Sequence, residues 1–317
     1  MPSDSLTQIP FAVSSAASQH DVSPQMQLIS DSSTLRRTLA TLRFSSDRSV
    51  RRVALVPTMG NLHEGHLSLV KQARHYADIV IATVFVNPLQ FGAGEDFDQY
   101  PRTLEADAEQ LAGAGCDLLF APAADELFPT TATNMTHVTA GAAGRGLCGA
   151  KRPGHFDGVV TLISLLFNLV QPDTAIFGEK DYQQLQVIKA LVRDLHFPID
   201  VVGAAIVRDH DGLALSSRNG YLSDIERATA PTLYRTLVCI KELLEQGLSH
   251  EHAVEEGIRQ LDAQGFTADY LELRDRHTLA PATAGTAEAI LLVAAYLGTT
   301  RLLDNVKVDL PEQPDAQ

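Results

Sequence analysis

Two histidines stand three residues apart in the segment Pro57–His66, which reads PTMGNLHEGH. Val53–Thr58, just before them, is a short apolar run of the kind that forms a buried strand ending in a turn. Near the start of a following helix, His63 and His66 would share one face, roughly 5–6 Å apart at Cβ. Helix N-termini favour anions, because their N–H groups are free and the helix dipole is positive there. The spacing therefore predicts a phosphate site with two imidazole donors.

Two other interpretations of this segment need weighing. One histidine could simply cap the helix, but Gly60 and Gly65 open space beside the pair and favour the phosphate site. A zinc-protease motif needs two residues between its glutamate and its second histidine. Only Gly65 lies between Glu64 and His66, so that motif is excluded.

Two further segments place cationic or hydroxyl side chains after an apolar run. Gly178–Asp181 (GEKD) follows a predicted strand, where Lys180 would reach a phosphate from the carboxyl edge of a parallel sheet. Leu215–Asn219 (LSSRN) offers two hydroxyls and the guanidinium of Arg218 as a clamp for phosphate oxygens. The alternatives are a solvated turn for the first segment and a Ser-rich surface turn for the second.

Amide side chains form a third group. Asn87 and Gln90 end another predicted strand and could orient a hydroxy acid, although an ordinary strand exit would look the same. Gln183 and Gln184 follow Lys180 and invite the same interpretation. Residues 146–155 (GLCGAKRPGH) form a Gly-rich basic loop that is either a lid over an anionic site or a surface loop.

The order of elements predicts how these segments are held. Strand-like and helix-like runs alternate up to about residue 206, which favours an α/β fold, a Rossmann-like doubly wound parallel sheet with helices on both faces. Two helical stretches, 223–245 and 250–264, then precede three strand-like runs, which predicts a smaller α+β domain. The expected organisation is a disordered leader (1–28), a Rossmann-like domain (29–206), a small α+β lid domain (207–310) and a tail (311–317).

Composition excludes several classes of protein. The 317 residues carry 25 Lys and Arg against 39 Asp and Glu, a formal charge of −14 that argues against nucleic-acid or membrane partners. The stretch Phe91–Phe128 alone holds −8 of this charge and is expected to be mostly a solvated helix, with Glu105, Asp107 and Glu109 facing water. The three cysteines form no CxxC pair, so neither a zinc ribbon nor a disulfide framework is predicted. The N-terminus lacks the basic residues of a signal or transit peptide, and the expected location is cytoplasmic.

Six collinear segments together carry a family resemblance: PTMGNLHEGH, FVNPLQF, RPGHFDG, FNLVQPD, FGEKDYQQL and LALSSRNGYL. The first resembles the signature of the nucleotidylyltransferase superfamily, which includes class I aminoacyl-tRNA synthetases. The full set resembles the pantothenate synthetases (pantoate–β-alanine ligases) over roughly residues 27–309. Leu215 stands where many relatives have Met, a swap of similar volume.

The resemblance implies a ligase that joins (R)-pantoate and β-alanine through a pantoyl adenylate, releasing AMP and pyrophosphate. It implies that the domain over 29–206 binds ATP and pantoate, that Mg²⁺ accompanies the ATP, and that the chain forms a homodimer. No residue is assigned as a metal ligand, and the sequence does not identify protein ligands for the Mg²⁺. Pantoate is assigned to Gln90 and Gln184, β-alanine to Gln90, and the acid role to His66. The catalytic donors are His63, His66, Lys180 and Arg218. ATP contacts are carried over to Met59, Gly60, Asn61, Leu62, His63, Glu64, Gly65, His66, Gly178, Glu179, Lys180, Asp181, Val207, Leu215, Ser216, Ser217 and Arg218.

Two other functions share part of this pattern. A nucleotidylyltransferase that stops at nucleotide transfer would use the same histidine pair but would need no amine. A nonenzymatic ATP-binding regulator would keep its role after His66→Ala. The motif set favours the ligase, and nothing in the sequence identifies a base for the amine of β-alanine.

Overall fold

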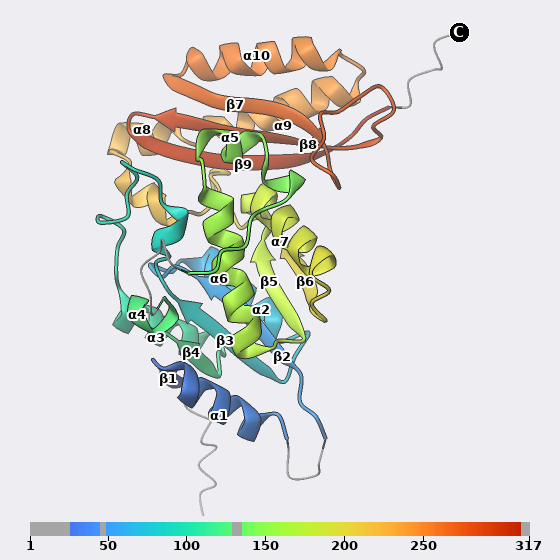
Figure 1. Ribbon diagram of the computed structural model, residues 1–317. Coiled ribbons are helices and arrows are strands. Elements are labelled where there is room, and N and C mark those ends of the chain that lie inside the picture. Colours follow the sequence, from blue (N-terminus) through green and yellow to red (C-terminus); the bar gives the residue numbers. More distant parts are fainter. Residues whose placement is uncertain (1–25, 45–48, 129–134, 312–317) are drawn as a thin grey trace, which may run out of the picture.

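The computed structural model describes residues 26–44, 49–128 and 135–311 (Figure 1). Six parallel strands form its larger sheet, in the spatial order β1-β4-β3-β2-β5-β6. This arrangement confirms the predicted α/β class with a doubly wound parallel sheet. The strands are β1 (Gln27–Ile29), β2 (Val53–Thr58), β3 (Ile79–Val84), β4 (Leu118–Phe120), β5 (Thr174–Gly178) and β6 (Asp200–Ala204).

Helices cover both faces of this sheet, because the strands are apolar on both sides. One face packs against α1 (Ser32–Leu42), α6 (His155–Val170) and α7 (Tyr182–Asp194), and Figure 1 shows α6 in front of the strands. The other face packs against α2 (Glu64–Ala73) and α3 (Leu104–Gly113). Shorter helical segments are η1 (Pro88–Gln90), α4 (Ala124–Leu127), η3 (Ala142–Gly144), α5 (Leu147–Lys151) and η4 (Glu179–Asp181). Within the described residues no helix is long and apolar enough to cross a membrane.

The C-terminal elements form a second, antiparallel sheet of β7 (Phe266–Asp275), β8 (Glu288–Leu297) and β9 (Thr300–Asp309), as predicted. Helices α9 (Thr232–Glu245) and α10 (His250–Asp262) cover one face. The other face meets the larger unit, where Ile290 and Leu292 pack against Leu147 and Tyr182 (Figure 1). The domain boundary near residue 206 stays a prediction; it lies between β6 and η5 (Ser217–Tyr221).

The helix expected over 223–245 is two helices, α8 (Asp224–Thr229) and α9. Pro231 separates them, because proline has no backbone N–H to donate within a continuous helix.

The N-terminal end of the larger sheet differs from expectation. The predicted leader reaches residue 28, but Gln27 and Leu28 belong to β1, which pairs with β4. Residues 1–25 of that leader lie outside the described residues, as do 312–317 of the predicted tail. Helix α1 was also missed, although Asp31 gives a local signal: its carboxylate caps the helix by accepting from Thr34 N at 2.8 Å.

The strand order places the sequence motifs. β2 lies between β3 and β5, so the sheet runs from β2 in two directions, and open α/β sheets bind ligands at the carboxyl ends of such strands. The histidine motif follows β2, and the GEKD turn follows β5. The two predicted phosphate-binding segments are therefore adjacent.

Asp107 does not face water as predicted for this side of α3. Its side chain is only 1% exposed, whereas Glu105 and Glu109 face water. The Asp107 carboxylate accepts from Asn61 N at 3.0 Å and Leu62 N at 2.8 Å. These amides belong to a turn in which Gly60 and Asn61 have positive φ values of 85° and 50°. Asp107 thus ties α3 to the turn that leads into His63.

We expect Asp107→Ala to lower the free energy of unfolding by about 1–3 kcal/mol, because one buried and one part-buried N–H group lose their acceptor. Chemical denaturation of the variant measures this change. Glu109→Gln, on the exposed face of the same helix, should leave stability within about 0.5 kcal/mol of the parent. Equal stabilities for the two variants would show that the Asp107 contacts contribute nothing.

Candidate active site

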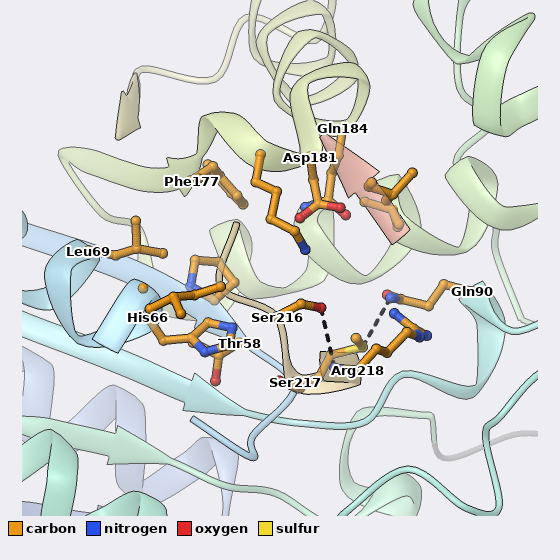
Figure 2. A pocket seen from close by; sticks show the side chains of 18 of the residues that line it. Thr58, His66, Leu69, Gln90, Phe177, Asp181, Gln184, Ser216, Ser217 and Arg218 are labelled. Atoms are coloured by element: carbon orange, nitrogen blue, oxygen red, sulfur yellow. Dashed lines mark hydrogen bonds between the residues drawn. The ribbon is translucent and has the colours of Figure 1, made fainter. Parts of the chain in front are cut away.

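A cavity of about 230 Å³ opens at the carboxyl ends of β2 and β5 (Figure 2). Residues from segments far apart in the sequence line its walls. Figure 2 shows His66, Ser216 and Gln184 around the same space, from α2, the loop before η5 and α7 respectively. Of the residues carried over from the family, the cavity is lined by Met59, His63, Gly65, His66, Gln90, Gly178, Lys180, Asp181, Gln184, Val207, Leu215, Ser216, Ser217 and Arg218.

The remaining carried-over residues do not line the cavity. Gly60, Asn61 and Leu62 form the turn held by Asp107. Glu64 faces water and lies 3.4 Å from Lys71, and the Glu179 carboxylate contacts Lys307. Direct ATP contacts for these five residues stay predictions.

The histidine pair combines both interpretations of its motif. His63 is the N-cap of α2, and its Nδ1 accepts from Gly65 N at 3.1 Å. Nδ1 of His66 accepts from His63 N at 3.3 Å, so the two rings form a reciprocal cap with centroids 4.0 Å apart. A Cβ at Gly65 would lie 2.8 Å from the His63 ring, which explains the glycine there. Capping therefore occurs, and both rings still line the cavity.

Capping also decides where the ring protons lie. An Nδ1 that accepts a backbone N–H has no proton, so the neutral ring carries its proton on Nε2. Burial and the Lys180 ammonium lower the pKa of His63 to about 4. Burial, His63 and Lys180 lower the pKa of His66 to about 3. At neutral pH each imidazole is therefore an uncharged Nε2–H donor.

A third histidine behaves similarly. His155 is buried, with Nδ1 2.8 Å from the Gln90 carbonyl oxygen and Nε2 3.1 Å from Nη1 of Arg152. Burial, followed by the Arg152 charge, lowers the pKa of His155 to about 4. The unfolded chain should return all three histidines to a pKa of roughly 6.5.

We therefore expect stability to fall on acidification. Between about pH 6.5 and 4 the unfolded chain binds protons that the folded chain does not, so the free energy of unfolding decreases as pH is lowered through this window. Calorimetric Tm values between about pH 7.5 and 4.5 measure the effect. A Tm that is constant over this range would contradict the buried neutral histidines.

Arg218 is not the free cation that the sequence suggests. Its Nε and Nη2 donate to the Asp96 carboxylate at 3.1 and 2.9 Å. Ser216 Oγ accepts from Arg218 N at 3.3 Å (Figure 2). Ser217 Oγ donates to the Asn61 carbonyl oxygen at 2.9 Å. Asp96 of the acidic stretch Phe91–Phe128 thus pairs with a cavity residue, while most acids of this stretch, such as Glu105 and Glu109, are exposed as expected.

The glutamines take different positions. Gln90 Oε1 accepts from Asn87 Nδ2 at 3.0 Å, and its Nε2 lies 3.1 Å from Met59 Sδ (Figure 2). Asn87 is fully buried and Met59 accepts one N–H of Nε2, so the Gln90 amide is oriented and keeps its second N–H to donate. Gln184 lines the cavity. Gln183 is buried outside the cavity, and its Oε1 accepts a hydrogen bond from Cys148 N at 3.0 Å. The sequence did not separate these two neighbours.

Six polar residues of the wall had no site assignment from the sequence: Thr58, Thr83, Tyr100, Arg152, His155 and Arg301. Arg152 and His155 belong to the basic loop left open as lid or surface; Arg152 donates twice to Glu95, at 2.7 and 2.6 Å. Tyr100 and Arg301 stand in no recognisable motif. Within the part of the chain that the structure describes, no group of three or more His, Cys, Asp or Glu side chains could hold a metal ion.

The chain is similar in sequence to one family of known proteins. Residues 27–307 match the family model described as pantoate-beta-alanine ligase. A pantothenate synthetase of Chromohalobacter salexigens is 58% identical over 286 residues, covering 90% of this chain and 100% of that protein. A pantothenate synthetase of Pseudomonas fluorescens is 57% identical, covering 82% of this chain and 91% of that protein.

Solved structures give the same result. A pantothenate synthetase from Thermus thermophilus aligns with a TM-score of 0.82 at 48% identity, covering 89% of this chain and 99% of its own. A pantoate-beta-alanine ligase from Francisella tularensis, complexed with beta-gamma ATP and beta-alanine, aligns with a TM-score of 0.73 at 29% identity, covering 91% of this chain and 99% of its own.

Proposed function

This chain belongs to the pantoate–β-alanine ligase family, and from that premise we propose how its cavity makes pantothenate. The enzyme is an ATP-dependent ligase. A carboxylate oxygen of (R)-pantoate attacks the α-phosphorus of ATP, and pyrophosphate leaves. The amine of β-alanine then attacks the acyl carbon of the pantoyl adenylate, AMP leaves with the bonding electrons, and the nitrogen loses its extra protons.

The first step builds negative charge on the phosphates, and fixed donors that meet this charge are the main catalytic resource. The single observation that carries the proposal is the set of donors at the carboxyl ends of β2 and β5. Neutral His63 and His66 present Nε2–H groups beside the Lys180 ammonium. Their low pKa favours hydrogen bonding by His66 over proton transfer. Arg218 keeps Nη1 for a phosphate oxygen, since Asp96 occupies its other edge.

The acid substrates are assigned to the amide side of the cavity. The oriented Gln90 amide can donate to a pantoate or β-alanine oxygen, and Gln184 faces the same space for pantoate. Mg²⁺ would arrive with the ATP phosphates, where it needs only one or two carboxylates from the protein, and Asp181 is the carboxylate in the cavity wall. The ion would neutralise phosphate charge. That the chain forms a homodimer and that it is cytoplasmic stay predictions.

The test is a coupled assay. Purified protein with ATP, Mg²⁺, pantoate and β-alanine should release AMP, pyrophosphate and pantothenate in equal amounts. With β-alanine omitted, pantoate should support exchange of pyrophosphate into ATP. Release of ADP, or AMP formation that depends on neither acid, would overturn the proposal.

A further inference from the structure

Asn305, in the middle of β9, lies against the GEKD turn although it comes from the other sheet. Its side chain is buried, at 4% exposure. Its Nδ2 donates to the Glu179 carbonyl oxygen at 2.8 Å and to the Lys180 carbonyl oxygen at 3.1 Å. One amide group therefore holds two consecutive carbonyls of η4.

These two carbonyls flank a single Cα atom. The Glu179 carbonyl belongs to the peptide plane before Lys180, and the Lys180 carbonyl belongs to the plane after it. Because peptide units are planar, fixing both planes fixes φ and ψ of Lys180 and so the direction of its Cα–Cβ bond. That direction sets where the ammonium can reach in the cavity.

β9 is itself held firmly at this point. Asp304 is buried and receives two hydrogen bonds from Arg208, at 2.6 and 2.8 Å, as well as one from Asn305 N at 2.8 Å. Lys307, two residues further on, contacts the Glu179 carboxylate at 2.9 Å, but its side chain is 46% exposed, so this surface ion pair adds little to the anchoring. The amide of Asn305 is thus presented from a rigid element, which a positioning role requires.

We propose that Asn305 is a positioning residue that aims Lys180 at the phosphates during adenylate formation. This inference rests on the proposed function for the role of Lys180. It makes the small sheet part of the catalytic apparatus, since the strand that holds the lysine turn comes from that sheet.

Asn305→Ser is the first test, because serine is too short to hold both carbonyls and adds no charge. Pyrophosphate exchange with pantoate should slow by roughly 10- to 100-fold, the scale expected for a misplaced catalytic group. Pantothenate formation from pre-formed pantoyl adenylate and β-alanine should be unchanged, since it needs no attack on ATP. Equal losses in both half-reactions would indicate a general structural defect and overturn the proposal.

A double-mutant cycle adds a second criterion. In the Lys180→Met background, Asn305→Ser should cause no further loss of exchange, because the group that it positions is gone. Additive losses would contradict the proposal. Lys307→Met is the matched control: it removes a contact to the same turn without touching its carbonyls, and exchange should stay at the parent level. Asn305→Leu, which nearly keeps the shape, removes the donors and adds no charge, serves if the serine variant does not fold.

A readout independent of catalysis separates this inference from the proposed function. Lys180 lowers the pKa of His63 and of His66, so its displacement should raise both. In NMR titrations, Asn305→Ser should shift both pKa values upward, part of the way to those of Lys180→Met. Unshifted values would overturn the positioning role even if the ligase assay succeeds. A failed assay with shifted values would overturn only the function.

Discussion

Lys180→Met is expected to slow adenylate formation by about 10²–10³-fold while the protein stays folded. Lys180 does not cap a helix and does not belong to a hydrophobic core, so its replacement should not disturb the fold. It lies half-buried in the short η4 turn and lines the cavity. Its charge contributes, after burial, to the lowered pKa of His63 and of His66, so the ammonium lies close to the proposed phosphate site. Methionine keeps the length of the side chain and removes the ammonium.

Pyrophosphate exchange at varied ATP concentrations measures the loss. The lysine meets phosphate charge in both the ground state and the transition state, so we expect KM for ATP to rise as kcat falls. Lys189→Met, at an exposed position of α7, is the control and should behave as the parent. Exchange that survives Lys180→Met at the parent rate would exclude the lysine from the reaction.

His66→Ala should lower the rate of adenylate formation by a similar factor, about 10²–10³. The substitution removes an uncharged Nε2–H donor from the cavity wall. It also removes the Nδ1 that accepts from His63 N, and losing a capping interaction costs about 0.5–2 kcal/mol. The alanine variant should therefore lose both activity and stability.

His66→Gln separates these two effects. A glutamine at this third helical position can still accept from the N-cap amide, as in a capping box, but it does not reproduce the imidazole donor. We expect the glutamine variant to keep the parent Tm in calorimetry and to lose as much pyrophosphate exchange as the alanine variant. His75→Gln, beyond the end of α2, is the control. A glutamine variant with parent activity would reduce His66 to a capping residue.

Much of the fold follows from local patterns. Buried parallel strands such as Val53–Thr58 and Ile79–Val84 are continuous apolar runs, and the helices between them show apolar residues at helical spacing. β1 could not be found this way, because three residues are too short to show a period and its pairing with β4 is distant in sequence. The break between α8 and α9 does have a local signal, since Pro231 cannot donate a backbone hydrogen bond within a helix.

Local sequence patterns likewise predict some residues of the candidate site and not others. The histidines, Lys180 and Arg218 were found because each follows a strand or sits in a recognisable segment. Asp107 was misassigned, since an acid between two exposed acids looks solvated until its acceptor role toward Asn61 and Leu62 is seen. Arg301 and Tyr100 reach the cavity from elements that carry no local sign of a ligand.

By itself, the sequence determined the family, the two kinds of sheet and the strand ends at which donors gather, because strand periods, turns and caps are encoded within a few residues. Only the tertiary structure decided which charges meet. Arg218 is paired with Asp96, 122 positions away, and the turn of Lys180 is held by Asn305, 125 positions away. Such contacts depend on how two sheets pack together, and the burial that gives them their strength is a property of the assembled core.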